Sequence, residues 1–193
     1  MTHMITTVRL GELDRAALTT HFLSLGREDR RLRFGAPIAD EALREYVARL
    51  HFDRDGLFAV QDEALAIVAV VHVATTGKSA ELGLSVLPHA RAQGLGNALY
   101  RRAVTFLRNR GGEEIFVHCL AENGAMMHLA RKNGMRIVHS AGESDARLAL
   151  EPATADSFIN EWLDDQQGRS VQVQRVNARL VDTMLTPFAT KAP

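Results

Sequence analysis

Apolar residues recur along the chain with two spacings, one typical of helices and one typical of strands. The β-branched run at residues 5–10 predicts a first strand, and the helical spacing in residues 12–26 predicts a helix that Gly26 can end. A second helix is expected in residues 40–50, where Asp40 can act as the N-cap. The dense charges of residues 27–33 carry no apolar period, and we interpret this segment as a solvated loop.

Three strand-like runs come next, in residues 56–61, 64–75 and 80–87. The second run is almost wholly apolar, which predicts a strand buried on both faces. Asp62-Glu63 fits a hairpin turn between the first two runs. Such short connections indicate an antiparallel meander.

Helices and strands alternate in the next part of the chain. A helix is expected after Gly96, a strand at 115–120, a helix from Asn123, and closing strands at 135–139 and 146–150. The order is therefore strand, two helices, three strands, helix, strand, helix, two strands. It predicts an α/β domain over residues 1–150, with a mixed, mostly antiparallel sheet of six to seven strands flanked by helices.

Residues 151–193 have a separate pattern and are interpreted as a helical C-terminal extension. We expect two helices with Gly168 ending the first, although residues 171–174 alternate in a way that also suits a strand. An apolar face on these helices needs cover, either from the domain or from a second copy in a homodimer, and we favour the homodimer. The face comprises Phe158, Trp162, Val176, Leu180 and Phe188.

Composition excludes several classes of function. The 193 residues carry 23 basic and 23 acidic side chains, and this balance argues against a nucleic-acid partner. One cysteine, Cys119, rules out an internal disulfide or a multi-cysteine metal site and suits the reducing cytoplasm. The N-terminus lacks the pattern of a signal peptide, and the longest apolar stretch, residues 64–71, is too short to span a bilayer. We therefore expect a cytoplasmic protein without a metal, nucleic-acid or membrane partner.

The chemistry centres on the turn at residues 91–96, Arg-Ala-Gln-Gly-Leu-Gly. Two glycines before a helix let backbone N–H groups approach an anion, and the helix N-terminus adds its positive dipole end. A P-loop needs Gly-Lys-Ser/Thr, but Asn97 follows here. A dinucleotide fold needs the motif after a first parallel strand, whereas a meander precedes it here. The remaining alternatives are a phosphate cradle of another kind or a turn that only reverses the chain.

The spacing Val86-x-Pro88-x-x-Arg91-x-x-Gly94-x-Gly96-x-x-Leu99 resembles the acetyl-CoA signature of the GNAT N-acetyltransferase superfamily. Residues 121–126 and 129–135 resemble the next two landmarks of that superfamily, and the likeness covers about residues 5–150. Segments 23–25, 31–34, 80–83 and 120–123 are also similar to the catalytic domain of bacterial protein lysine acetyltransferases.

The resemblance implies the GNAT fold and transfer of an acetyl group from acetyl-CoA, as co-substrate, to an amine on a protein lysine or a small molecule. It implies that the strands at 80–87 and 115–120 splay apart around the pantetheine arm. Arg91 would shield the pyrophosphate, and Asn123 would hydrogen-bond the arm. The resemblance further implies that the arm pairs with backbone groups of Leu84, Val86 and Leu87, and that the pyrophosphate accepts from the backbone N–H groups of Gln93, Gly94, Leu95, Gly96 and Asn97.

Attack on a thioester requires a base, because an amine such as that of lysine is protonated at neutral pH. Glu81 is the first candidate: it matches the glutamate expected in the lysine acetyltransferases, and strand alternation puts it on one face with Gly83 and Ser85. His118 is the second, with a reference pKa suited to proton transfer. Each residue has a plainer interpretation, as a solvent-facing strand residue and a half-buried histidine. Cys119 could form an acyl-enzyme, but an unactivated strand cysteine is more often a small core residue.

Two positions depart from the family pattern, and the first is Ala92, where a glycine is frequent. Many GNAT enzymes place a tyrosine general acid where this chain has Ala130. The leaving thiolate would then take a proton from water or from the attacking amine. The same departure supports an alternative function, a CoA-binding regulatory module without turnover.

Overall fold

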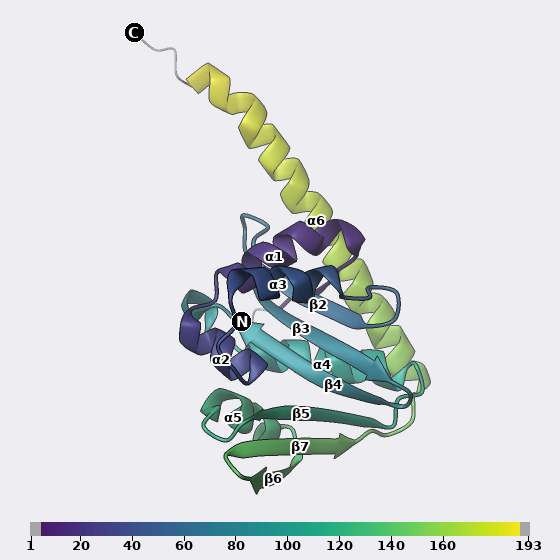
Figure 1. Ribbon diagram of the computed structural model, residues 1–193. Helices are drawn as coiled ribbons and strands as arrows, with labels where there is room; N and C mark the ends of the chain where they lie inside the picture. The colour runs from purple at the N-terminus through teal and green to yellow at the C-terminus, as the bar shows by residue number, and fades with distance from the viewer. Residues whose placement is uncertain (1–4, 190–193) are drawn as a thin grey trace.

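The computed structural model describes residues 5–189, with side chains described through residue 178. Seven strands form one mixed sheet in the order β1-β2-β3-β4-β5-β7-β6, and every neighbouring pair is antiparallel except β4 and β5 (Figure 1). The strands are β1 (Val8–Arg9), β2 (Gly56–Gln61), β3 (Ile67–Thr76), β4 (Ser79–Val86), β5 (Glu114–Leu120), β6 (Arg136–Ser140) and β7 (Glu143–Ala149). The predicted meander is β2-β3-β4, and β3 is buried from Ile67 to Val73 as expected.

Helices cover both faces of the sheet. One face carries α1 (Arg15–Leu23), α2 (Arg27–Phe34) and α3 (Asp40–Ala48), and α4 (Leu95–Arg108) lies behind it (Figure 1). Helix α5 (Gly124–Lys132) packs into the same apolar cluster as α4. Short 3-10 turns occur at Glu12–Asp14 and Pro88–Ala90. Two apolar clusters, one on each face, bury the sheet and confirm the predicted α/β class with flanking helices.

The expected loop at residues 27–33 is wrong, because this segment is helix α2. Polar contacts hold it in place, so it needs no apolar stripe. The guanidinium of Arg30 donates to the carbonyl oxygens of Leu23 and Leu25, both at 2.9 Å, and to Asp40. Gly35 ends the helix in the left-handed conformation, with φ of 79°. A pattern search keyed to apolar residues misses such a helix.

Strands β4 and β5 diverge, as the family resemblance implied. They pair at only three positions, Ser79–Glu81 against Glu114–Phe116, although each strand continues beyond them. Helix α4 supplies the crossover that a parallel pair requires. We call the region between β4 residues 82–86 and β5 residues 117–120 the wedge. Helix α2 contacts both strands and lies across it.

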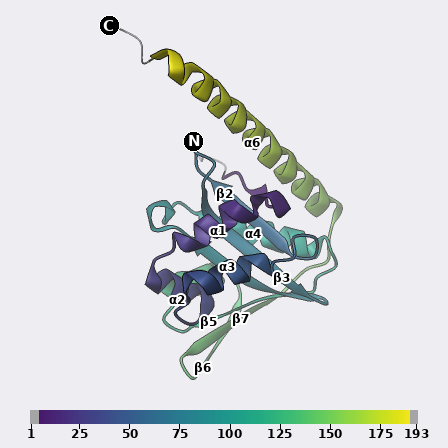
Figure 2. The same ribbon diagram turned by 45° about the horizontal axis from the view of Figure 1, so that its top comes forward.

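The C-terminal segment is one helix, α6 (Ala155–Ala189), rather than the two that we predicted. Gly168 does not end it; this residue is buried where α6 crosses β1. The sequence predicted that Gly168 ends a helix, but in the structure it permits close packing of two backbones. The local sequence does not distinguish these two roles of a glycine. Helix α6 runs along the domain and projects beyond it (Figures 1 and 2).

We predict that Gly168→Ala destabilises the protein by about 1–3 kcal/mol, the usual cost of overpacking. A Cβ at this position would lie 2.6 Å from the backbone oxygen of Thr7 and 3.4 Å from Cα of Val8, so the helix must shift away from β1. Urea denaturation measures the change. The matched control is Gly124→Ala in α5, where a Cβ has no neighbour within 4 Å. Equal stability of the two variants would contradict the close approach.

Candidate active site

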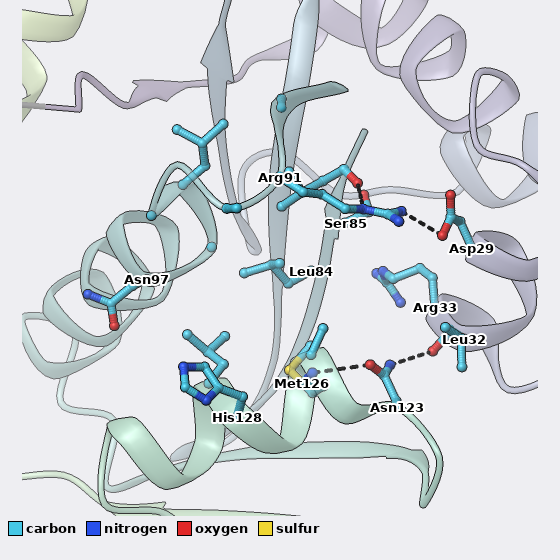
Figure 3. Close-up of a pocket in the computed structure, with 18 of the residues that line it drawn as sticks. Asp29, Leu32, Arg33, Leu84, Ser85, Arg91, Asn97, Asn123, Met126 and His128 are labelled. Atoms are coloured by element: carbon cyan, nitrogen blue, oxygen red, sulfur yellow. Dashed lines mark hydrogen bonds and ion pairs between the residues drawn. The ribbon is translucent and has the colours of Figure 1, made fainter. Parts of the chain in front are cut away.

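A cavity of about 630 Å³ opens between the start of α4, strand β4, helix α2 and helix α5 (Figure 3). Eight of the twelve site residues predicted from the sequence line it, and these all come from the expected cofactor set. They are Leu84, Val86, Arg91, Gly94, Leu95, Gly96, Asn97 and Asn123. Segments far apart in the sequence therefore meet at one hollow beside the wedge.

The turn before α4 has the geometry of an anion cradle. Gly94 adopts the left-handed conformation, with φ of 81°, and Ala92 is left-handed as well, with φ of 61°. A glycine would adopt the Ala92 conformation with less strain, in keeping with the glycine frequent at this place in the family. Within the described residues, the six backbone N–H groups of Ala92 to Asn97 have no protein acceptor. These N–H groups, which we call the cradle, lie at the positive end of α4 and suit a phosphate.

Arg91 reaches across the mouth of the cavity to α2. Its Nη2 donates to Asp29 Oδ1 at 2.6 Å, and its Nε donates to the carbonyl oxygen of Val86 at 3.2 Å (Figure 3). The ion pair is partly exposed, so solvent screens it and its exchange for another anion costs little. Arg91 therefore lies next to the cradle, and its guanidinium is paired with the carboxylate of Asp29.

Ser85 lies on the cavity wall in front of a buried histidine, His21. The Nδ1–H of His21 donates to the carbonyl oxygen of Ile67 at 2.9 Å, which leaves Nε2 to accept from the Ser85 hydroxyl at 2.8 Å. Burial lowers the pKa of His21 to about 4, so the ring is neutral at physiological pH. The Ser85 proton is therefore directed away from the cavity, and its oxygen is left as an acceptor.

The two predicted asparagines also hold the site together. Asn123 caps α5 by accepting from the Met126 N–H at 3.1 Å, and it donates to the carbonyl oxygen of Leu32 at 3.1 Å (Figure 3). Asn97 accepts from Asn133 Nδ2 at 3.1 Å. Asn123 thereby ties α5 to α2 across the wedge.

Two residues of the predicted cofactor set do not line the cavity. Leu87 is buried in the cluster on the α1–α3 face, its N–H donates to Val68 and its carbonyl accepts from Ala90. Its backbone groups are thus already bonded, and the role expected for Leu87 lacks geometric support. Gln93 points its side chain elsewhere, although its backbone N–H belongs to the cradle.

The two candidate bases lie outside the cavity wall, both on strands that border the wedge. Glu81 is exposed at the last paired position of β4, opposite Phe116 of β5. His118 is also exposed, and its Nδ1 lies 3.0 Å from Asp145 Oδ1 on β7. The hydrogen bond to Asp145 raises the pKa of His118, which favours the protonated ring and makes it a poorer base at neutral pH. The raised pKa counts against His118 as the base, and the role of Glu81 stays a prediction.

Cys119 is buried in the core, and burial raises the pKa of its thiol. That environment suits a core residue rather than a nucleophile. Ala130 is buried as well, so no hydroxyl stands at the position of the family tyrosine. In residues 5–189 no group of three His, Cys, Asp or Glu side chains is placed to hold a metal ion, and no helix is long and apolar enough to cross a membrane.

Several cavity residues escaped the sequence analysis. Asp29 and Arg33 come from α2, which was expected to be a loop, and Lys132 and His128 come from α5. Arg33 belongs to the segment 31–34 that resembles the lysine acetyltransferases, and Lys132 belongs to the segment 129–135 that resembles a superfamily landmark, but neither was singled out as a site residue.

Known proteins share this architecture. A model of the acetyltransferase (GNAT) family matches residues 24–135, more than half of the chain. Among solved structures, the GNAT domain of S. lividans PAT superposes with a TM-score of 0.65 at 18% identity, covering 75% of this chain and 89% of that one. No curated protein matches the chain by sequence.

Two further structures show the same fold. A ribosomal-protein-alanine N-acetyltransferase from Brucella melitensis has a TM-score of 0.59 and 16% identity, over 75% of this chain and 99% of that one. The Salmonella typhimurium protein yncA, solved with its cofactor acetyl-CoA, has a TM-score of 0.61 and 14% identity, over 79% and 97%. At these identities the likeness supports the fold, and the family model supports the family. The chain belongs to the GNAT acetyltransferase family.

Proposed function

We propose that this protein is an N-acetyltransferase that transfers the acetyl group of acetyl-CoA to an amine. The observation that carries the proposal is the cradle at the N-terminus of α4, which opens into a cavity beside the wedge. A pyrophosphate needs several converging donors, and the cradle supplies six N–H groups without protein acceptors among the described residues. The cavity, at about 630 Å³, has a size typical of ligand sites.

The residues present fit acetyl-CoA along the length of the cavity. Backbone groups of residues 93–97 would hold the pyrophosphate, and Arg91 would exchange Asp29 for a phosphate. Leu84 and Val86 would border the pantetheine arm where β4 has lost its pairing with β5, and Asn123 lies beside them. When bound, acetyl-CoA supplies an acetyl group activated as a thioester.

Glu81 is the base in this proposal. It marks the point where β4 and β5 part, on the same face of β4 as Gly83 and Ser85. Its exposed carboxylate can accept a proton from the acceptor amine, directly or through water, and pass it to solvent. With Ala130 in place of the family tyrosine, the leaving thiolate takes its proton from water or from the amine.

A thiol-release assay with acetyl-CoA against a panel of small amines and lysine-containing proteins tests the proposal. We expect release that depends on the amine, together with saturable acetyl-CoA binding in calorimetry. Binding without release from any acceptor would instead establish the regulatory module without turnover. Absence of binding would overturn both functions.

We also propose a homodimer in the cytoplasm that pairs through α6. The single buried cysteine suits a reducing compartment. Large apolar side chains of α6 remain open to solvent: Phe158 is 51% exposed, Trp162 is 58% exposed and Val176 is 45% exposed. The domain leaves about half of each side chain uncovered, and a second copy is the cover that we propose. Leu180 and Phe188, also expected on this face, lie beyond the described side chains.

Sedimentation tests the dimer. The wild-type chain, with a monomer mass of 21.3 kDa, is expected to sediment as a dimer, and the double variant Phe158→Ser/Trp162→Ser as a monomer. Asn160→Ser, at an exposed polar position of the same helix, is the control and stays dimeric. A wild-type monomer at micromolar concentration would refute the proposal.

A further inference from the structure

Arg33 brings a positive charge to the end of the cavity remote from the cradle. It lies in the last turn of α2 and lines the cavity. Figure 3 shows it entering from the side opposite Asn97 of α4, with Leu84 between them. The start of α4 and Arg33 therefore border opposite sides of the cavity, and Arg91, which is bound to Asp29, and Lys132 line it as well.

A chain of hydrogen bonds orients the guanidinium. Arg33 Nη2 donates to the Tyr46 hydroxyl at 3.2 Å, and that hydroxyl lies 2.9 Å from His72 Nδ1. His72 Nε2 in turn lies 3.1 Å from Asp55 Oδ2. Burial lowers the pKa of His72 and keeps the ring neutral, so Nε2–H donates to Asp55 and Nδ1 accepts from Tyr46. The donors all run in one direction, from Arg33 to Asp55.

Gly83 provides the space in which the guanidinium lies. A Cβ added to Gly83 would overlap Nη2 and Cζ of Arg33, so the head group lies directly against β4 where a side chain would otherwise be. The rings of Phe34 and Tyr46 also hold it, with Cζ 4.8 Å and 5.9 Å from their centroids. Arg33 is therefore fixed at the border of the wedge rather than free to swing into solvent.

This charge is not neutralised by the surrounding protein. Within the described residues no carboxylate lies within 4.0 Å of the Arg33 guanidinium, and its buried Nε has no acceptor. The acidic residue that lines the cavity, Asp29, is bound to Arg91. A fixed cation repels an acceptor that carries only ammonium groups, whereas a guanidinium binds a carboxylate through paired, charge-assisted hydrogen bonds.

We propose that Arg33 binds a carboxylate of the acceptor, an inference that rests on the function proposed above. The acceptors are then small amines that carry a carboxylate, such as amino acids. Glu81 lies two residues before Gly83 on the same face of β4, so an acid and a cation border the place where the acceptor enters. A zwitterion matches that order of charges: its amine faces Glu81 and its carboxylate faces Arg33.

Matched acceptors test the proposal: an amino acid, its amide and its decarboxylated amine. The wild-type protein is expected to show kcat/KM at least about tenfold higher for the amino acid, the range of a charged hydrogen bond. Arg33→Gln abolishes that preference by lowering kcat/KM for the amino acid alone. Arg33→Lys keeps the charge and is the conservative control for folding. It is expected to retain part of the preference for the amino acid. The dissociation constant of acetyl-CoA stays within about twofold in all variants, since the cradle is intact.

Gly83→Ala removes the binding geometry without touching the arginine itself. The new methyl group displaces the flexible end of Arg33, so this variant is expected to lose the preference as Arg33→Gln does. Thermal unfolding of each variant confirms that it is folded.

Three outcomes overturn the inference. The first is equal or better turnover of the carboxylate-free amines or of peptide lysines by the wild-type protein. The second is an equal loss in Arg33→Gln for all three acceptors, and the third is a matching loss of acetyl-CoA affinity. If amines are acetylated without a carboxylate preference, only this inference fails. If no acceptor releases thiol, the proposed function fails with it.

Discussion

Glu81→Gln is expected to lower kcat by about a hundredfold or more while acetyl-CoA binds as before, because general-base catalysis contributes roughly 10²–10⁴ in rate. Glutamine keeps the size of the side chain and removes only the proton acceptor. Glu81 is exposed at the last paired position of β4, so the substitution leaves the core untouched. Steady-state thiol release gives kcat, and calorimetry gives the dissociation constant of acetyl-CoA.

Two further variants make the result specific. Glu63→Gln changes an exposed glutamate in the β2–β3 turn and is expected to leave kcat unchanged. His118→Asn is expected to reduce kcat by less than about tenfold, since a ring paired with Asp145 is a poor base. Full activity in Glu81→Gln, or a larger loss of kcat in His118→Asn than in Glu81→Gln, would show that Glu81 is not the base.

Gly96→Val is expected to weaken acetyl-CoA binding by about tenfold or more, equivalent to roughly 1.4 kcal/mol. The branched side chain would stand in the cavity beside Leu84 and keep phosphate oxygens from the N–H groups of the cradle. A Cβ at Gly96 would make only an ordinary contact, 3.6 Å from Cδ2 of Leu84, so the fold accepts the first carbon. Calorimetry measures the affinity, and thermal unfolding measures the stability.

The matched control is Gly11→Val, at a position where a Cβ would have no neighbour within 4 Å and which does not line the cavity. It is expected to bind acetyl-CoA with unchanged affinity. Unchanged affinity in Gly96→Val as well would show that the phosphate does not occupy the cradle, and the proposed function would lose its main support.

The cradle could be predicted from the sequence because its chemistry is local. Gly94 is the N-cap of α4 and Gly96 lies in its first turn, so six consecutive residues specify the geometry. Strands β2 to β4 could be predicted equally well, because their apolar runs and short turns are visible in the local sequence.

Features that depend on distant contacts could not be predicted. Helix α2 has no apolar stripe because Arg30 and other polar side chains hold it, and Arg33 faces the cavity only because Gly83 lies opposite. Gly168 was predicted to end a helix, because the sequence does not show that β1 packs against this glycine. Strand alternation gave the face on which Glu81 lies but could not show how far the cavity extends along β4.

The three paired positions between β4 and β5 have a thermodynamic consequence. They join a four-stranded block, β1 to β4, to a three-stranded block, β5, β7 and β6, through a very short ladder. Helix α2 bridges the blocks from outside: Arg33 lies against Gly83 of β4, while Leu32 and Arg31 bond to Asn123 and Glu122 after β5. A ligand whose amides replace the missing ladder would join the halves from within. If the proposed function is correct, occupancy of the wedge and resistance to unfolding are linked quantities, and the cohesion of this sheet would rise with the concentration of acetyl-CoA.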